Sequence, residues 1–228
     1  MELLDALTTT RAIRRYAQEP ISEHDLNRIL FAATRAPSGS NRQPCRFVVL
    51  RSESTAPSAV RARQILGEAF RSMWAAKEAG DGYRSGTGTD PASPKSRMAA
   101  TMRHFVDHIE FAPAIIFPCY QRWREPDPSE GASIYPACQN LLLAARDLGY
   151  GGVMTVWHRP VETALRTALH MPDDVVIAAT IPLGRPLGRH GTVRRRPLAE
   201  VVFEDRWKHT ATWAADPPGT RVTAGRPA

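Results

Sequence analysis

The sequence predicts a single domain in which helices and strands alternate along the chain. Apolar residues recur at helical spacing in several segments, short β-branched runs lie between them, and no shift in composition marks a boundary. The length of 228 residues fits one large domain or two small ones, and 43% hydrophobic and 23% charged residues are normal for a globular protein. We expect one domain over residues 1–207 and a loose, Pro-, Gly- and Thr-rich tail over residues 208–228.

The first elements follow from the residue pattern in chain order. Leucines at helical spacing predict a short helix over residues 2–10. Ser22 suits the N-cap of a second helix, which should end before Pro37. The apolar, β-branched run at 46–50 predicts a buried strand, and residues 57–79 have a helical pattern.

Glycines and prolines at 80–94 predict a loop, after which the alternation of helices and strands resumes. The remaining predicted helices cover 96–109, 132–148 and 160–170, and the remaining predicted strands cover 113–119, 153–156 and 175–183.

Composition excludes several classes of function. The net charge of +7 suggests a polyanion partner, but only three of the 30 basic residues are lysines, and the one dense run, 194–196, has no interleaved aromatic residues. We therefore expect no nucleic-acid binding. The apolar stretches are far shorter than the ~20 residues of a membrane helix, and the N-terminus lacks the apolar core of a secretory signal. Three cysteines without a CxxC pair indicate a cytoplasmic protein without a disulfide framework.

One histidine pair has the spacing of a metal site. His104 and His108 lie four residues apart on a predicted helix, and this spacing can bind zinc. No H-E-x-x-H pattern and no third ligand accompany them. An ordinary helix face is therefore the favoured interpretation, and we expect no metal.

Four segments carry residues that suit a ligand, and each also has a plain structural explanation. Arginines in the run 10–16 suit a phosphate or form a solvated face. Small, uncharged polar residues at 36–44 suit the edge of a flat heterocycle or form a turn. Glycines at 148–155 allow close approach of a ligand or cap a helix. The fourth segment begins with a strand that ends in glycine, at 181–186. A basic cluster and a short extended stretch follow it at 194–202. Rossmann and P-loop motifs are absent.

In this order the four segments resemble the FMN-dependent nitroreductase family. Its R-[SH]-x-R run, [AS]-P-[ST]-[GS]-x-[NH]-x-Q-P-[WF] loop, L-G-[LY]-G helix end and terminal R-R-P-L-x-E segment all have counterparts between residues 8 and about 205. The resemblance implies an α+β, nitroreductase-like fold, with a central mixed β-sheet flanked by helices. It also implies an intertwined homodimer that holds FMN at its interface.

The resemblance further implies which residues bind FMN. One subunit would supply Arg11, Ala12, Ile13, Arg15, Gly152, Val153, Met154, Thr155, Arg194 and Arg195. The other subunit would supply a loop with Ser38, Gly39, Ser40, Asn41 and Gln43. The flavin would carry out the chemistry, so no catalytic side chain is expected, although Arg11 or Arg15 could stabilise the reduced flavin.

The implied activity is reduction of nitroaromatics, quinones or similar flat acceptors by NAD(P)H in a ping-pong mechanism. The variable segment 70–105 would cover the substrate, with Trp74, Tyr83 and Arg84 as candidate lid residues, or else be a plain surface excursion. Another flavin reaction on the same fold is an alternative: reductive dehalogenation, ene reduction, flavin breakdown or use of a deazaflavin donor. A non-catalytic basic binding protein is a third.

Two positions depart from the family pattern. Ala12 stands where Ser or His is common, and Cys45 stands where Trp or Phe usually follows Gln-Pro. We do not expect Cys45 to be a nucleophile, because no partner base is evident. No motif distinguishes NADH from NADPH.

Overall fold

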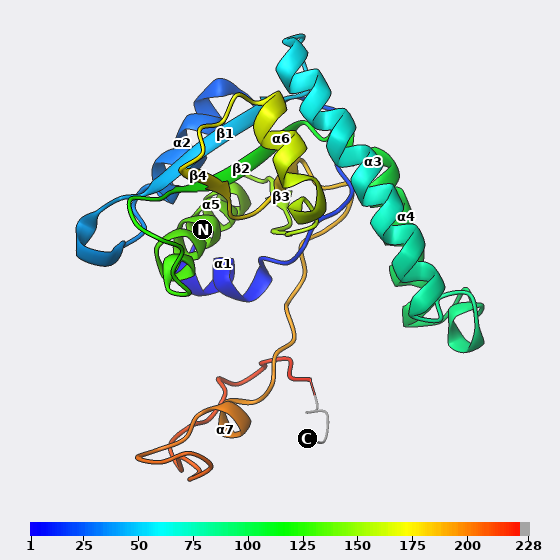
Figure 1. The fold of residues 1–228 in the computed structure, drawn as a ribbon. Coiled ribbons are helices and arrows are strands. Elements are labelled where there is room, and N and C mark those ends of the chain that lie inside the picture. The colour runs from blue at the N-terminus through cyan, green and yellow to red at the C-terminus, as the bar shows by residue number, and fades with distance from the viewer. Residues whose placement is uncertain (224–228) are drawn as a thin grey trace.

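The computed structural model describes residues 1–223, which form a five-stranded sheet with helices on both faces (Figure 1). The strands are β1 (Cys45–Arg51), β2 (Ala114–Gln121), β3 (Gly151–Gly152), β4 (Val175–Ile177) and β5 (Ile181–Gly184). Their order is β1-β2-β5-β3, and β4 also pairs with β2. The predicted α+β class is confirmed. All pairs among these strands are antiparallel, whereas the resemblance implies a mixed sheet.

Six helices lie close to their predicted positions. They are α1 (Leu3–Thr9), α2 (Glu23–Ala33), α3 (Pro57–Gly80), α4 (Pro94–His108), α5 (Glu130–Asp147) and α6 (Glu162–Ala168). The predicted extended segment at 194–202 is wrong in part, because Leu198–Val201 forms the short helix α7. The predicted N-cap Ser22 accepts a hydrogen bond from the Asp25 backbone N–H at 3.1 Å, which satisfies a free donor of the first turn of α2. Within residues 1–223, no helix is both long and apolar enough to cross a membrane.

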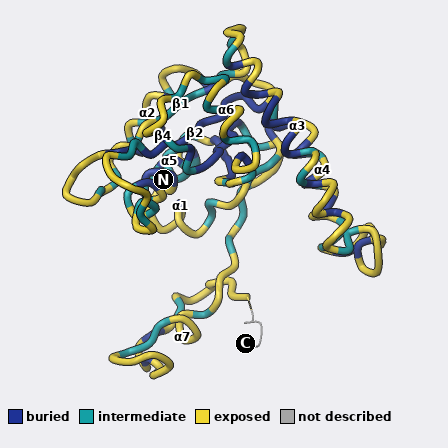
Figure 2. Tube along the Cα trace, in the orientation of Figure 1, coloured by how far each residue is buried: buried dark blue, intermediate teal, exposed yellow. Residues whose placement is uncertain are grey.

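Strand β2 lies at the centre of the core and is buried on both faces (Figure 2). Ile115 and Phe117 belong to the apolar cluster that includes α3, α4 and α6. Ala114 and Ile116 belong to the cluster that includes α2 and α5. The alternation follows from the two-residue period of a strand, and coverage of both faces explains why β2 is apolar throughout.

The predicted strand 175–183 is divided into β4 and β5 by a β-bulge. Cys119 of β2 faces Ile177 of β4, whereas Ile116 of β2 faces Ile181 of β5. Three residue steps on β2 therefore correspond to four on the other side, so the pairing register changes by one residue. The apolar pattern alone does not indicate this interruption.

The predicted strand at 153–156 is wrong in position, because β3 is the preceding glycine pair. A Cβ atom at Gly152 would lie 2.6 Å from the carbonyl oxygen of Pro182, so only glycine permits this approach of β3 to β5. Beyond β3, an isolated bridge joins Thr155 to Thr180. Met154 is exposed, which leaves this segment available to a ligand.

Helices α3 and α4 form a long hairpin, and the C-terminal part of the chain extends away from the body as an arm after its contact between Val193 and Thr8 (Figure 1). This C-terminal arm, residues 188–223, folds back on itself, with the Thr223 N–H donating to the Arg195 carbonyl at 2.7 Å. Ala211 and Ala214 are buried within it. The tail expected to be loose thus has defined contacts as far as residue 223, and residues 224–228 lie outside the described residues. The domain boundary at residue 207 stays a prediction.

Candidate functional site

Two of the predicted cofactor-binding segments lie side by side. The Ile13 N–H donates to the Gly152 carbonyl at 2.9 Å, and the buried Tyr16 hydroxyl donates to the Ile13 carbonyl at 2.6 Å. A Cβ atom at Gly151 would lie 2.6 Å from Cγ1 of Ile13, so glycine is what allows the segments to approach. The structure therefore joins the run after α1 to the segment after β3.

The arginines at this junction have no acidic partner. Arg11 is exposed, and Arg14 is half-buried. Burial lowers the pKa of the Arg14 guanidinium, which shows that its charge is poorly solvated. Within residues 1–223, the ion pairs include neither of these side chains. Unpaired guanidinium groups suit an anionic ligand such as a phosphate.

A cavity of about 280 Å³ lies between this junction and the α3–α4 hairpin. We call it the substrate cavity. Its lining consists of Arg14, Trp74, Lys77, Tyr83, Met98, Met102, Phe105, Val153, Met154, Thr155 and Trp157. The structure thus brings the predicted lid residues Trp74 and Tyr83 to the predicted segment 153–155. Aromatic and methionine side chains make up much of the wall, which suits a flat, largely apolar ligand.

The third predicted lid residue, Arg84, acts differently. It is absent from the cavity lining, and its Nη2 donates to the buried Glu78 carboxylate at 2.8 Å. Arg103 of α4 donates to the same carboxylate through Nε at 2.6 Å. Hydrogen bonds from Arg84, and then from Arg103, lower the pKa of Glu78. This triad links α3, the loop that carries Tyr83, and α4.

The predicted loop at 38–43 lies elsewhere, on the opposite side of the sheet from the α3–α4 hairpin (Figure 1). Ser40, Asn41 and Gln43 each have a φ of 51°, which is unusual for residues other than glycine. The Gly39 N–H donates to the Ser133 hydroxyl at 3.2 Å. The loop borders its own cavity of about 290 Å³, which shares no lining residue with the substrate cavity. The predicted residues therefore form two separate groups in one chain.

The C-terminal arm begins close to the first group. A Cβ atom at Gly191 would lie 3.4 Å from Nη1 of Arg11, and the Val193 N–H donates to the Thr8 carbonyl at 2.8 Å. Arg194 and Arg195 follow directly, and both are exposed. The two predicted phosphate-binding runs, from opposite ends of the sequence, thus approach each other where the arm leaves the body.

Arg14 is the main site residue that sequence reasoning missed. The prediction named Arg15, whose side chain is exposed and whose carbonyl accepts from the Leu187 N–H at 3.0 Å. Arg14 instead lines the substrate cavity. The spacing of the R-[SH]-x-R run would have indicated it, because this pattern starting at Arg11 ends at Arg14.

The α4 residues of the cavity were missed for another reason. Met98, Met102 and Phe105 follow one another at helical spacing, a pattern that ordinarily marks a core-facing stripe. Met102 and Phe105 are indeed buried, and they border the cavity from the core side. Periodicity cannot distinguish a packed wall from the wall of a cavity.

Cys45 has the surroundings of a structural thiol. Its Sγ lies 3.0 Å from the Ser133 carbonyl oxygen, and burial raises the pKa of the thiol. A raised pKa disfavours the thiolate, which is the nucleophilic form. Among the residues that the structure describes, no group of three His, Cys, Asp or Glu side chains is placed to hold a metal ion.

A sequence model described as the nitroreductase family matches residues 7–185. The chain belongs to the nitroreductase family. This membership confirms the family predicted from the four segments, and it confirms the predicted enzyme class, an oxidoreductase.

Two curated relatives cover most of the chain. A protein of Archaeoglobus fulgidus, provisionally named NADH dehydrogenase/NAD(P)H nitroreductase, is 30% identical over 187 residues, or 81% of this chain and 86% of the relative. The nitrobenzene nitroreductase of Ectopseudomonas oleovorans is 26% identical over 198 residues, or 79% of this chain and 85% of the relative.

Solved structures share the fold. A structure from Desulfovibrio desulfuricans, provisionally described as a nitroreductase in complex with FMN, has a TM-score of 0.62 and 27% identity, covering 91% of this chain and 98% of that one. Iodotyrosine deiodinase bound to FMN and 3-iodo-L-tyrosine has a TM-score of 0.65 and 20% identity, covering 90% of this chain and 100% of that one. At this low identity, the likeness to the deiodinase shows the fold alone. The nitroreductase-like fold is confirmed.

Proposed function

We propose that the protein is an FMN-dependent oxidoreductase that uses a reduced pyridine nucleotide to reduce flat electrophilic acceptors such as nitroaromatics and quinones. The observation that carries this proposal is the junction of Ile13 with Gly152, beside the substrate cavity and two unpaired arginines. Bound FMN would supply the redox chemistry, accepting a hydride from the donor and passing electrons to the acceptor. The names of the relatives support the same cofactor and reaction class.

The residues present fit FMN, whose phosphate is terminal, and the sequence contains no dinucleotide-binding motif. Arg11 and Arg195 offer permanent positive charge for a terminal phosphate where the arm leaves the body. The backbone of residues 152–155 would lie against the flavin ring. Arg14 lines the substrate cavity with a poorly solvated charge, so it replaces Arg15 as the better candidate for stabilising the negative charge of reduced flavin.

The substrate cavity adjoins residues 153–155, and its volume of about 280 Å³ is small. Donor and acceptor would therefore occupy it in turn, which is the basis of the proposed ping-pong mechanism. Its lining contains no Asp or Glu, so the chain supplies no carboxylic acid as a proton donor there. The side chains of the cavity would position the acceptor and exclude water.

We further propose that the protein functions as a homodimer. The loop 38–43 lies away from the other predicted residues, so a second copy would bring it to the flavin. Leu3 and Leu4 of α1 are 67% and 72% exposed, and Trp207 of the arm is 79% exposed. Apolar surfaces of this kind mark interaction sites. A cytoplasmic location stays a prediction.

Anaerobic titration of the purified protein tests this function. We expect a yellow protein that releases FMN on denaturation and loses its flavin absorbance when NADH or NADPH is added. A nitroaromatic or quinone should restore the absorbance. Bleaching only by a reduced deazaflavin would favour another reaction on the same fold. A colourless protein that cannot be reconstituted with FMN would contradict the proposal and favour a non-catalytic binding protein.

A further inference from the structure

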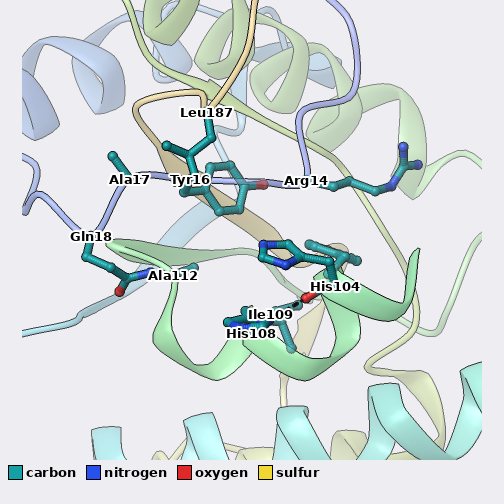
Figure 3. A pocket seen from close by; sticks show the side chains of 10 residues that line it. Arg14, Tyr16, Ala17, Gln18, His104, His108, Ile109, Ala112 and Leu187 are labelled. Atoms are coloured by element: carbon teal, nitrogen blue, oxygen red, sulfur yellow. Dashed lines mark hydrogen bonds between the residues drawn. The ribbon is translucent and has the colours of Figure 1, made fainter. Parts of the chain in front are cut away.

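A second cavity adjoins the substrate cavity and has a different lining. It has a volume of about 300 Å³ and lies between the segment 14–18 and the end of α4 (Figure 3). Arg14 and Phe105 line both cavities, so the two are neighbours. A ligand longer than a nicotinamide ring could extend from one into the other past these two side chains.

The second cavity is a slot with aromatic rings on its two sides. Figure 3 shows the Tyr16 ring on one side and the His104 and His108 rings on the other. The Tyr16 hydroxyl is engaged by the Ile13 and Pro182 carbonyls, so the residue presents its ring to the slot. A planar base suits such a slot, because aromatic rings stack on one another.

The slot also has a basic character. The imidazoles of His104 and His108 stack with their centroids 4.2 Å apart at an angle of 18°. Burial, and then the nearby charges of His108 and Arg15, lower the pKa of His104, while Asp107 opposes them. The permanent charges of Arg14, which lines the slot, and of Arg15 nearby would favour a bound anion. None of the lining residues is an Asp or Glu.

We propose that this second cavity binds the adenosine diphosphate part of the reduced pyridine dinucleotide, whose nicotinamide would occupy the substrate cavity. This inference rests on the proposed function. The diphosphate would lie near Arg14, which lines both cavities, and His104, which lines the second. The adenine would enter the slot between Tyr16 and the stacked imidazoles, within reach of the Gln18 amide at its end.

The test uses the FMN-loaded protein and introduces a negative charge into the slot from α4. His104→Glu places a carboxylate in the slot, and His24→Glu, on the exposed face of α2, is the matched control. Calorimetry would measure the binding of ADP-ribose, which is the dinucleotide without its nicotinamide. Stopped-flow absorbance would measure flavin reduction by NADH, by NADPH and by 1-methyl-1,4-dihydronicotinamide, which has neither phosphate nor adenine.

We expect His104→Glu to weaken ADP-ribose binding by roughly tenfold or more and to raise the half-saturating NADH or NADPH concentration by a similar factor, because the introduced carboxylate would repel the diphosphate. Reduction by the small donor should not change, and His24→Glu should resemble the wild type. Should His104→Glu not fold, His104→Gln should also weaken binding of ADP-ribose, NADH and NADPH, by a smaller factor, and should leave reduction by the small donor unchanged.

Four results would overturn the proposal. The first is equal loss for all three donors, which would indicate damage to the flavin site. The second is an unchanged affinity for ADP-ribose in the His104 variants. The third is wild-type protein that binds no ADP-ribose. The fourth is inorganic phosphate binding as tightly as ADP-ribose, which would reduce the slot to a simple anion site. If neither nucleotide reduces the flavin, the proposed donor is wrong, yet the calorimetry still decides what the cavity binds.

Discussion

The phenol ring of Tyr83 packs against the indole of Trp74 with a centroid distance of 5.1 Å and an interplanar angle of 54°. Trp74 belongs to α3 and is 4% exposed, whereas Tyr83 belongs to the glycine-rich loop between α3 and α4. Both rings line the substrate cavity. The glycine-rich loop is therefore attached to α3 by this aromatic pair as well as by the Glu78 triad.

The first prediction concerns these two rings. Tyr83→Ala should change the acceptor half-reaction, because it removes part of the cavity wall while the core stays intact. Trp74→Phe should keep the fold, since an aromatic ring stays in place and no hydrogen bond is lost with the buried indole Nε1. FMN affinity should stay unchanged in both variants. Stopped-flow measurement of both half-reactions would check this, and variants with wild-type behaviour in both would show that the segment is a surface excursion.

The second prediction concerns the Glu78 triad. Glu78→Gln should loosen the loop that carries Tyr83, because Arg84 and Arg103 both lose a charged, buried partner. Amide hydrogen exchange should become faster in residues 81–93, and the acceptor KM should rise. The matched control is Glu23→Gln, which breaks an exposed ion pair with Arg51 and should cost less than about 1 kcal/mol. Unchanged exchange in the loop would show that the triad does not hold it.

The third prediction concerns cofactor retention. Arg195→Ala should weaken FMN binding by roughly 10- to 150-fold, since a charge-assisted hydrogen bond contributes about 1.5–3 kcal/mol. Arg206→Ala, also on the exposed part of the arm, is the control and should bind FMN normally. Fluorescence titration of the apoprotein with FMN would measure both affinities. Equal affinities would place the phosphate elsewhere.

The fourth prediction concerns pH. His158 is fully buried at the bulge between β4 and β5, where its Nε2 lies 2.9 Å from the Ile177 carbonyl and its Nδ1 accepts from the Thr180 hydroxyl at 3.0 Å. Burial is the main cause of a pKa below the usual 6.5. The unfolded chain then binds more protons than the folded protein, so the free energy of unfolding should fall as pH drops below 6.5. The slope from this group would reach at most about 1.4 kcal/mol per pH unit.

The control for pH is His158→Gln, whose amide can donate and accept in the same place without titrating. Urea unfolding on both sides of pH 6.5 would give the free energy of unfolding of each protein. The variant should lose less stability than the wild type on acidification. An identical loss in both would assign the pH dependence to other groups, such as His104 and His190, whose pKa values are also lowered.

Local signals were sufficient for most elements and insufficient where distant segments meet. Helical spacing and the Ser22 cap predicted α2, and the apolar run at 46–50 predicted β1. The bulge after Ile177 and the glycine strand β3 depend on pairing with β2 and β5, which no local pattern encodes. The choice between Arg14 and Arg15 is different, because the R-[SH]-x-R spacing that starts at Arg11 already indicates Arg14, the residue that lines the cavity.

The separation of the predicted site into two groups has a genetic consequence. If each flavin site combines residues 38–43 of one subunit with residues 11–15 of its partner, two inactive mutants can complement each other. A heterodimer of one subunit altered at Asn41 and one altered at Arg11 would contain one site with both lesions and one site with neither. Co-expression of the two variants should restore activity that neither variant shows alone, and mixing the separately folded dimers should restore it only as fast as subunits exchange.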